Sequence, residues 1–279
     1  MDLEQTFLNA LAQSGVVWGL GDDGVLLDTP KALYMLDLFS EGVHFKREWL
    51  SMRQIGYKAM CVNISDSIAM AACPKYALLG IQLPKGCNLA EMRQLVAGIA
   101  KACQEFKIKI VGGDTTLGRD LSLSVALIAK SHKPLERTKM RPKDLLVHTG
   151  TLGQSYKDLG TLLRGGKVSP KSKFIRPQLK NLLGFISSVR PFVHAGLDIS
   201  DGLLAECNRL SKLNKLACKL DNPRNKTYLS GEEYELLLSV PPKHKLALMR
   251  RAKQHRTKLN FVGVVRRGIS RYRPKIWHA

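Results

Sequence analysis

The tripeptide Ile-Ser-Asp occurs twice in the chain, at residues 64–66 and again at residues 199–201. Each copy follows an apolar stretch and precedes a run with helical spacing, so each is predicted to lie between a buried strand and a helix. A motif that recurs at the same kind of junction constrains the fold. It predicts two related α/β halves within 279 residues, a length that fits one large domain or two ordinary ones.

Asp66, in the first copy, has two possible uses at such a junction. A side-chain oxygen before a helix accepts hydrogen bonds from free backbone N–H groups and so caps the helix. A carboxylate in the same place can instead hold a divalent cation. The motif alone leaves both uses open, and they are compatible if Ser65 caps the helix while Asp66 faces a metal ion.

Composition excludes several classes of protein. Hydrophobic residues make up 44% of the chain, which indicates a packed core. No apolar run approaches the roughly 20 residues of a membrane helix, and the first residues lack the features of a signal peptide. The six cysteines form no C-x-x-C pair, so we expect reduced thiols. These features predict a cytoplasmic protein without a membrane partner.

The formal charge is +21, and residues 236–279 contain no Asp or Glu. A basic excess can mark a protein that binds nucleic acid or another anion. Few aromatic residues lie among these cations to stack on bases, so we interpret the excess as a basic surface and do not expect nucleic acid as a partner. A nucleic-acid-binding protein is the alternative from another functional class, and a salt-dependent shift assay would distinguish it.

Alternating apolar patterns predict the main elements. Residues 53–72 are interpreted as helix, short strand and helix, and residues 112–116 as a Gly-Gly-Asp-Thr-Thr break after a strand. Residues 131–144, with two prolines, are the candidate linker. Strands are predicted at 33–38, 78–83, 108–111, 121–129, 145–150 and 236–240, and helices at 89–106 and 203–216.

Carboxylates gather at glycine-rich turns and predicted strand ends. They can stay ionised together only with cations between them, and Mg²⁺ typically joins carboxylates to substrate phosphates. Residues 160–167 fail the P-loop pattern, and residues 19–24, which match G-x-G-x-x-G, lead into a strand and so do not predict a dinucleotide site. The pattern therefore predicts metal-assisted phosphoryl transfer. The aspartates are Asp22, Asp23, Asp37, Asp66, Asp114, Asp198 and Asp201.

Six blocks occur in the order and approximate spacing of one family. They are Gly-Asp-Asp at 21–23, Glu-Gly-Val-His-Phe at 41–45, Asn-Ile-Ser-Asp-Ser-Ile-Ala-Met at 63–70, Gly-Gly-Asp-Thr at 112–115, Asp-Ile-Ser-Asp-Gly-Leu at 198–203 and Gly-Glu-Glu-Tyr-Glu-Leu at 231–236. In these blocks the chain resembles thiamine-monophosphate kinases.

The resemblance implies a two-domain α/β (α+β) fold similar to aminoimidazole ribonucleotide synthetase. Residues 1–137 would bind ATP and metal and form a homodimer, and residues 138–279 would form the C-terminal α/β domain. It implies Mg²⁺-assisted, direct in-line transfer of the ATP γ-phosphate to thiamine monophosphate, giving thiamine diphosphate. The alternative within this fold is another ATP-using synthetase. A selenophosphate synthetase carries a reactive cysteine near its N-terminus, whereas the first cysteine here is Cys61.

The resemblance also assigns roles to single residues, none of them a general acid or base. Metal binding falls to Asp23, Asp37, Asp66, Asp114, Asp198 and Asp201, ATP binding to Gly113, Asp114, Arg137 and Ser200, and substrate binding to His44, Glu232 and Trp277. Met35 and Leu36 depart from the family, which has hydroxyl residues there, so a side-chain metal contact is lost. The segment between Asp201 and Glu232 is shorter than usual.

Overall fold

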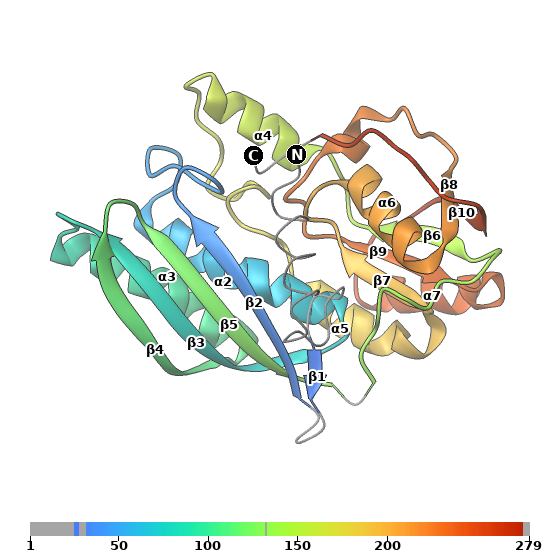
Figure 1. Ribbon diagram of the computed structural model, residues 1–279, viewed down its shortest axis with the longest axis horizontal. Coiled ribbons are helices and arrows are strands. Elements are labelled where there is room, and N and C mark those ends of the chain that lie inside the picture. The colour runs from blue at the N-terminus through green and yellow to red at the C-terminus, as the bar shows by residue number, and fades with distance from the viewer. Residues whose placement is uncertain (1–24, 28–31, 132, 276–279) are drawn as a thin grey trace, which may run out of the picture.

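The computed structural model describes residues 25–27, 32–131 and 133–275. Two five-stranded sheets, one in each half of the chain, form its framework (Figure 1). Residues 133–144, between the two sheets, contain neither helix nor strand, as expected for a linker. None of the described helices is long and apolar enough to cross a membrane.

The N-terminal sheet has the strand order β1-β2-β5-β3-β4. Strands β3 and β4 pair in parallel and the other neighbours are antiparallel. Helices α2 and α3 cover one face of this sheet (Figure 1). The elements are β1 (Val25–Leu27), β2 (Ala32–Ser40), α2 (Met52–Ala69), β3 (Cys73–Pro84), α3 (Leu89–Phe106), β4 (Lys109–Gly118) and β5 (Ser122–Lys130).

The C-terminal sheet has the order β7-β9-β6-β10-β8, with all neighbours antiparallel. Its strands are β6 (Leu145–Thr149), β7 (Ala195–Asp198), β8 (Leu216–Leu220), β9 (Leu236–Val240) and β10 (Leu259–Arg267). Its helices are α4 (Gln154–Leu163), α5 (Lys180–Val189), α6 (Leu203–Asn214) and α7 (Lys245–Gln254), with 3₁₀ turns η1 (Arg190–Phe192), η2 (Lys226–Leu229) and η3 (Pro242–His244).

Helix α2 corrects the prediction for residues 53–72, because it is one continuous helix with no strand inside it. The helix begins at Ser51, whose hydroxyl accepts the Gln54 N–H while the Gln54 side chain accepts the Ser51 N–H. It ends at Met70, whose N–H bonds the Asp66 carbonyl. Ser65 and Asp66 therefore lie in the last turns of the helix, and the prediction that either caps an N-terminus is wrong.

The two Ile-Ser-Asp copies consequently occupy different structures. The first lies inside α2, whereas the second forms the loop between β7 and α6, the strand-to-helix junction that was predicted. Strand β4 also differs from expectation, because it continues through residues 112–116 instead of breaking there. The predicted helix at 89–106 and the predicted strand at 236–240 are confirmed at both ends.

The larger hydrophobic core is shared by the two halves of the chain. It joins Ile55 and Met60 of α2 to Phe185 of α5 and Leu238 of β9. Nearly all of α2 is buried, which is typical of a helix surrounded by other elements. Helix α2 is therefore the element that both sheets pack against.

The opposite face of the N-terminal sheet is exposed and apolar. In β2 the exposed residues alternate with buried ones, so Asp37 shares the inner face with Met35 and Phe39. The outward side chains include Tyr34, Leu36 and Leu38 of β2 and Tyr76 and Leu78 of β3. Large apolar faces of this kind mark sites of association.

Candidate functional site

Helix α2 directs two polar side chains at the C-terminal half. Lys58 and Ser65 are seven residues apart, about two helical turns, and so share a face. The Lys58 ammonium donates to Glu232 Oε2 at 2.7 Å, and the Ser65 hydroxyl donates to Asp198 Oδ2 at 2.6 Å. All four residues are buried. The helix thus orients two carboxylates that the sequence assigned to the site.

The loops that carry these carboxylates are bonded to each other. The Ile199 N–H bonds the Glu235 carbonyl at 2.7 Å, and the Glu232 N–H bonds the Ser200 carbonyl at 2.6 Å. Glu232 and Tyr234 both have φ of 51°, a left-handed conformation that non-glycine residues seldom adopt. Residues held in this way concentrate at functional sites, where surrounding contacts offset the conformational cost.

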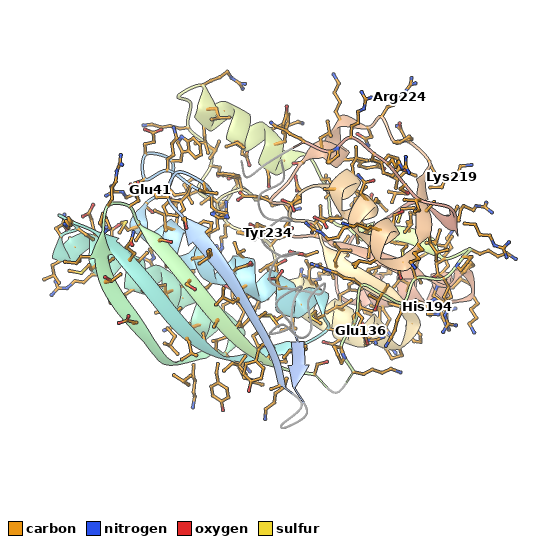
Figure 2. The ribbon with its side chains drawn as sticks, in the orientation of Figure 1. Glu41, Glu136, His194, Lys219, Arg224 and Tyr234 are labelled. Atoms are coloured by element: carbon orange, nitrogen blue, oxygen red, sulfur yellow. The ribbon has the colours of Figure 1, made fainter. Side chains whose placement is uncertain are left out.

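Tyr234 lies between the two halves of the molecule (Figure 2). Burial raises the pKa of its hydroxyl well above the usual 10, and the charges of Glu232, Asp198, Asp37 and Asp66 raise it further. These four carboxylates come from a loop, the end of β7, β2 and α2, and they all act on this one hydroxyl. The charges of Asp37, Asp66, Asp198 and Glu232 therefore all act on the Tyr234 hydroxyl, which stays protonated and able to donate.

The donor set fits Mg²⁺ bound jointly by protein and substrate. Among the described residues, no three acidic, histidine or cysteine side chains are grouped so that they could hold an ion by themselves. Mg²⁺ commonly takes one or two carboxylates and completes its shell with water and phosphate oxygens. Asp66 suits this role, because within residues 61–70 only it and Val62 are partly exposed.

Asp201 and Ser200 are held by a buried carboxylate beneath their loop. Glu206 accepts the Asp201 N–H at 3.1 Å and a bond from Arg209 at 2.7 Å, and Arg209 also bonds the Asp201 carboxylate at 3.0 Å. Burial raises the pKa of Glu206 to about 7, although the Arg209 charge opposes this rise. The loop thus rests on a group that changes its charge near neutral pH.

We expect Glu206→Gln to remove one pH dependence of stability. The pKa of Glu206 is raised on folding from 4.5 to about 7, so between these pH values the unfolded chain releases a proton that the folded chain keeps. The unfolding free energy therefore falls as pH rises through this window and levels off above it. The difference between wild type and variant should change by up to about 3 kcal/mol across the window. Urea unfolding from pH 4 to 8 measures this, and a constant difference contradicts it.

Asp114 lies away from the other site carboxylates within one chain. It is an exposed residue of β4, and β5 and β3 separate that strand from β2. Three strand spacings amount to about 14 Å. Its row across the sheet contains Gly80, Ser124 and the outward-facing Leu38, so Asp114 belongs to the outer face, whereas Asp37 belongs to the inner one. A Cβ at the neighbouring Gly113 would lie 2.0 Å from the Leu79 carbonyl oxygen, so strand packing itself requires glycine there.

The remaining predicted residues are dispersed. His44 follows β2, and its Nδ1 accepts the Ser40 N–H at 3.1 Å, which leaves the ring proton of the neutral imidazole on Nε2. The charge of Arg137 opposes the rise in the pKa of Glu206, the carboxylate beneath Ser200 and Asp201. Asp23 and Trp277 lie outside the described residues.

A second group of buried charges supports the 230–235 loop and was not predicted. The Glu233 carboxylate accepts the Gly153 and Ser155 N–H groups at 2.7 and 3.2 Å and so caps α4. The Lys173 ammonium lies 3.0 Å from Glu233 and 2.6 Å from Glu235. Lys58 was not predicted either. The sequence feature that could have indicated it is a single lysine within an apolar stretch.

Comparison with known proteins places the chain in a family. The model for the N-terminal domain of AIR synthase related proteins matches residues 21–130. Thiamine-monophosphate kinase of Aquifex aeolicus is 29% identical over 249 residues, covering 80% of each chain. The enzyme of Buchnera aphidicola subsp. Acyrthosiphon pisum is 30% identical over 253 residues, covering 81% of this chain and 77% of its own. The chain belongs to the thiamine-monophosphate kinase family.

The thiamine-monophosphate kinase fold extends over nearly the whole chain. The solved structure of AaThiL, complexed with AMPPCP and TMP, matches with a TM-score of 0.83 at 24% identity, covering 98% of this chain and 95% of that one. The predicted family and fold class are therefore confirmed.

Proposed function

We propose that this protein is a phosphotransferase that transfers the γ-phosphate of ATP to thiamine monophosphate, forming thiamine diphosphate and ADP. The observation that carries the proposal is the pair of bonds from Lys58 to Glu232 and from Ser65 to Asp198 at the junction of the two halves, where the charges of Asp37 and Asp66 also act on Tyr234, in a chain of this family. The AaThiL complex with AMPPCP and TMP supports the choice of both substrates.

Asp37, Asp66 and Asp198 would hold Mg²⁺, together with Asp23, Asp114 and Asp201. When bound, Mg²⁺ neutralises phosphate charge and positions the phosphates for in-line transfer. Ser65 fixes the orientation of Asp198, and Lys58 fixes that of Glu232. Glu206 holds the loop whose Ser200 would contact the nucleotide. Catalysis then rests on positioning and charge, without a general acid or base.

A direct assay tests the proposal. Purified protein with ATP, Mg²⁺ and thiamine monophosphate is expected to form thiamine diphosphate and ADP in equal amounts, measured by chromatography. The same mixture with EDTA is the control and should form neither. Phosphorylation of a different acceptor, with thiamine monophosphate left unchanged, would sink the substrate assignment.

We also propose a homodimer formed through residues 1–137, with 138–279 as a separate domain, in the cytoplasm. The exposed apolar face of the N-terminal sheet supports the dimer, because a second copy would bury Leu36, Leu38 and Leu78. That face also bears Asp114. A second sheet placed against it would bring Asp114 of one chain toward the site of the other, which accounts for its distance from Asp37 within one chain.

The double variant Leu36→Glu, Leu38→Glu is expected to be monomeric. These side chains are 60% and 55% exposed in the single chain, so charges there are tolerated in the monomer and desolvated in the dimer. Light scattering after gel filtration gives the mass. Leu246→Glu, at a position on α7 that is 68% exposed, is the control and should stay dimeric. A dimeric double variant contradicts the proposed interface.

Mixed dimers test whether Asp114 acts across that interface. Asp66→Asn and Asp114→Asn chains are each expected to be inactive alone. If the two residues serve one site from different chains, a mixed dimer has one fully intact site. Co-expressed chains that pair at random should then recover roughly a quarter of wild-type activity. Tandem affinity tags isolate the mixed dimers, and no recovery would place both residues in the same chain's site.

A further inference from the structure

A cavity of about 780 Å³ opens between the C-terminal half of α3, residues 171–178 and the first turn of α5. Its volume lies within the range of small-molecule sites. Four of its lining residues are cationic, namely Lys101, Lys171, Arg176 and Lys180. They come from three separate segments, so folding gathers their charge at one place.

The single carboxylate in the lining is already engaged. Glu105 accepts a hydrogen bond from the Tyr57 hydroxyl at 3.1 Å, and the Arg176 guanidinium lies 3.7 Å from the same oxygen. Arg176 also lies over the Tyr57 ring, 5.4 Å from its centre. This arrangement fixes the guanidinium at the cavity wall and offsets the one negative charge. The lining is consequently strongly positive.

The other lining groups also donate hydrogen bonds. Gln104, Gln178 and Asn181 contribute side-chain amides. Lys180 and Asn181 begin α5, where Leu179 supplies no side-chain acceptor for the first N–H groups. Ammonium, guanidinium and amide donors together form the set that binds phosphate groups.

We propose that this cavity binds a compact polyanion carrying phosphate groups, at a site separate from the carboxylate site around Tyr234. Residues 171–178 form the wall between the two. Lys171 and Arg176 face the cavity, whereas Lys173 bonds Glu235 and the Phe174 ring lies 3.8 Å from the Lys58 ammonium. A ligand held by Lys171 and Arg176 would therefore bind the same segment that supports the 230–235 loop and Lys58.

Metal-free titration with inorganic tripolyphosphate tests the proposal. In EDTA the clustered carboxylates repel a polyanion, so tight binding reports the cavity and not the kinase site. We expect one saturable site per chain by calorimetry at 0.15 M salt. Lys101→Glu, Lys180→Glu should weaken binding by at least about tenfold, since two charge-assisted contacts become repulsive. The neutral pair Lys101→Gln, Lys180→Gln should also weaken it, and thermal melts check that both fold.

The matched control is Lys219→Glu, Arg224→Glu. These exposed residues lie at the far side of the C-terminal half (Figure 2), and the change in net charge is the same. Binding by this control should change less than about twofold at that ionic strength. Equal losses in the control and in the cavity variants, or wild-type affinity weaker than about 1 mM, overturn the proposal. No step of the test uses turnover, so either result leaves the kinase assignment untouched.

Discussion

Asp66→Asn is expected to lower turnover by about a hundredfold to a thousandfold while the protein stays folded. Asp66 lies in the last turn of α2, and its charge acts on the Tyr234 hydroxyl together with those of Asp37 and Asp198. Asparagine keeps the shape of the side chain and loses the charge that would hold a cation. Because Asp66 is partly exposed, the asparagine amide can reach solvent and is not left buried without a hydrogen bond.

Steady-state kinetics with varied Mg²⁺ measure the effect. Asp221→Asn, at an exposed position on the C-terminal half, is the matched control and should keep wild-type turnover. Circular dichroism and thermal melting establish that both variants fold. Near-normal turnover in Asp66→Asn would mean that this carboxylate has only a structural role within α2.

Lys58→Met should destabilise the protein by about 3–5 kcal/mol, the usual cost of breaking a buried ion pair from one side. The Lys58 and Glu232 side chains are only 0% and 3% exposed. Glu232 Oε1 is buried without a hydrogen bond of its own. Losing the ammonium would therefore leave a charged carboxylate with no compensation.

The double variant Lys58→Met, Glu232→Gln should recover part of the loss, because it removes both charges together. Urea unfolding of the wild type, the two single variants and the double variant gives the coupling free energy of the pair. Lys253→Met, on the exposed side of α7, should change stability by less than about 0.5 kcal/mol. A loss below about 1 kcal/mol in Lys58→Met would show that Glu232 finds another partner.

Local sequence patterns predicted those helices and strands that have one buried face and one exposed face. Helix α3 has one buried face and a capping pair, Asn88 with Glu91, so its ends follow from the sequence. Strand β5 alternates buried and partly exposed residues and was predicted for the same reason. Helix α2 is buried almost all round, so its apolar residues show no helical period, and Val62 and Ile64 resembled a strand. The Ser51 and Gln54 pair was the available signal for its start.

The site residues were predicted mainly from the sequence blocks shared with the family, and less from the chemistry of neighbouring residues. The blocks selected Asp66 and Asp198, and the match to the family also selected Asp37; the charges of all three act on the buried Tyr234 hydroxyl. Lys58 was not selected, because its partner Glu232 is 174 residues away in sequence. The distance between Asp37 and Asp114 was also unpredictable, since it depends on strand order in the sheet. Local sequence patterns do not show which residues far apart in the chain contact each other in the fold.

The two bonds that α2 makes to the C-terminal half have a consequence for how such proteins diversify. If the C-terminal half were exchanged for that of a relative, Lys58 and Ser65 would lose their partners unless the new half also has Glu at position 232 and Asp at position 198. Positions 58 and 232 should therefore change together among homologous sequences. Chimaeras joined in the linker should fold only when these pairs are retained, so the two halves are inherited as one unit.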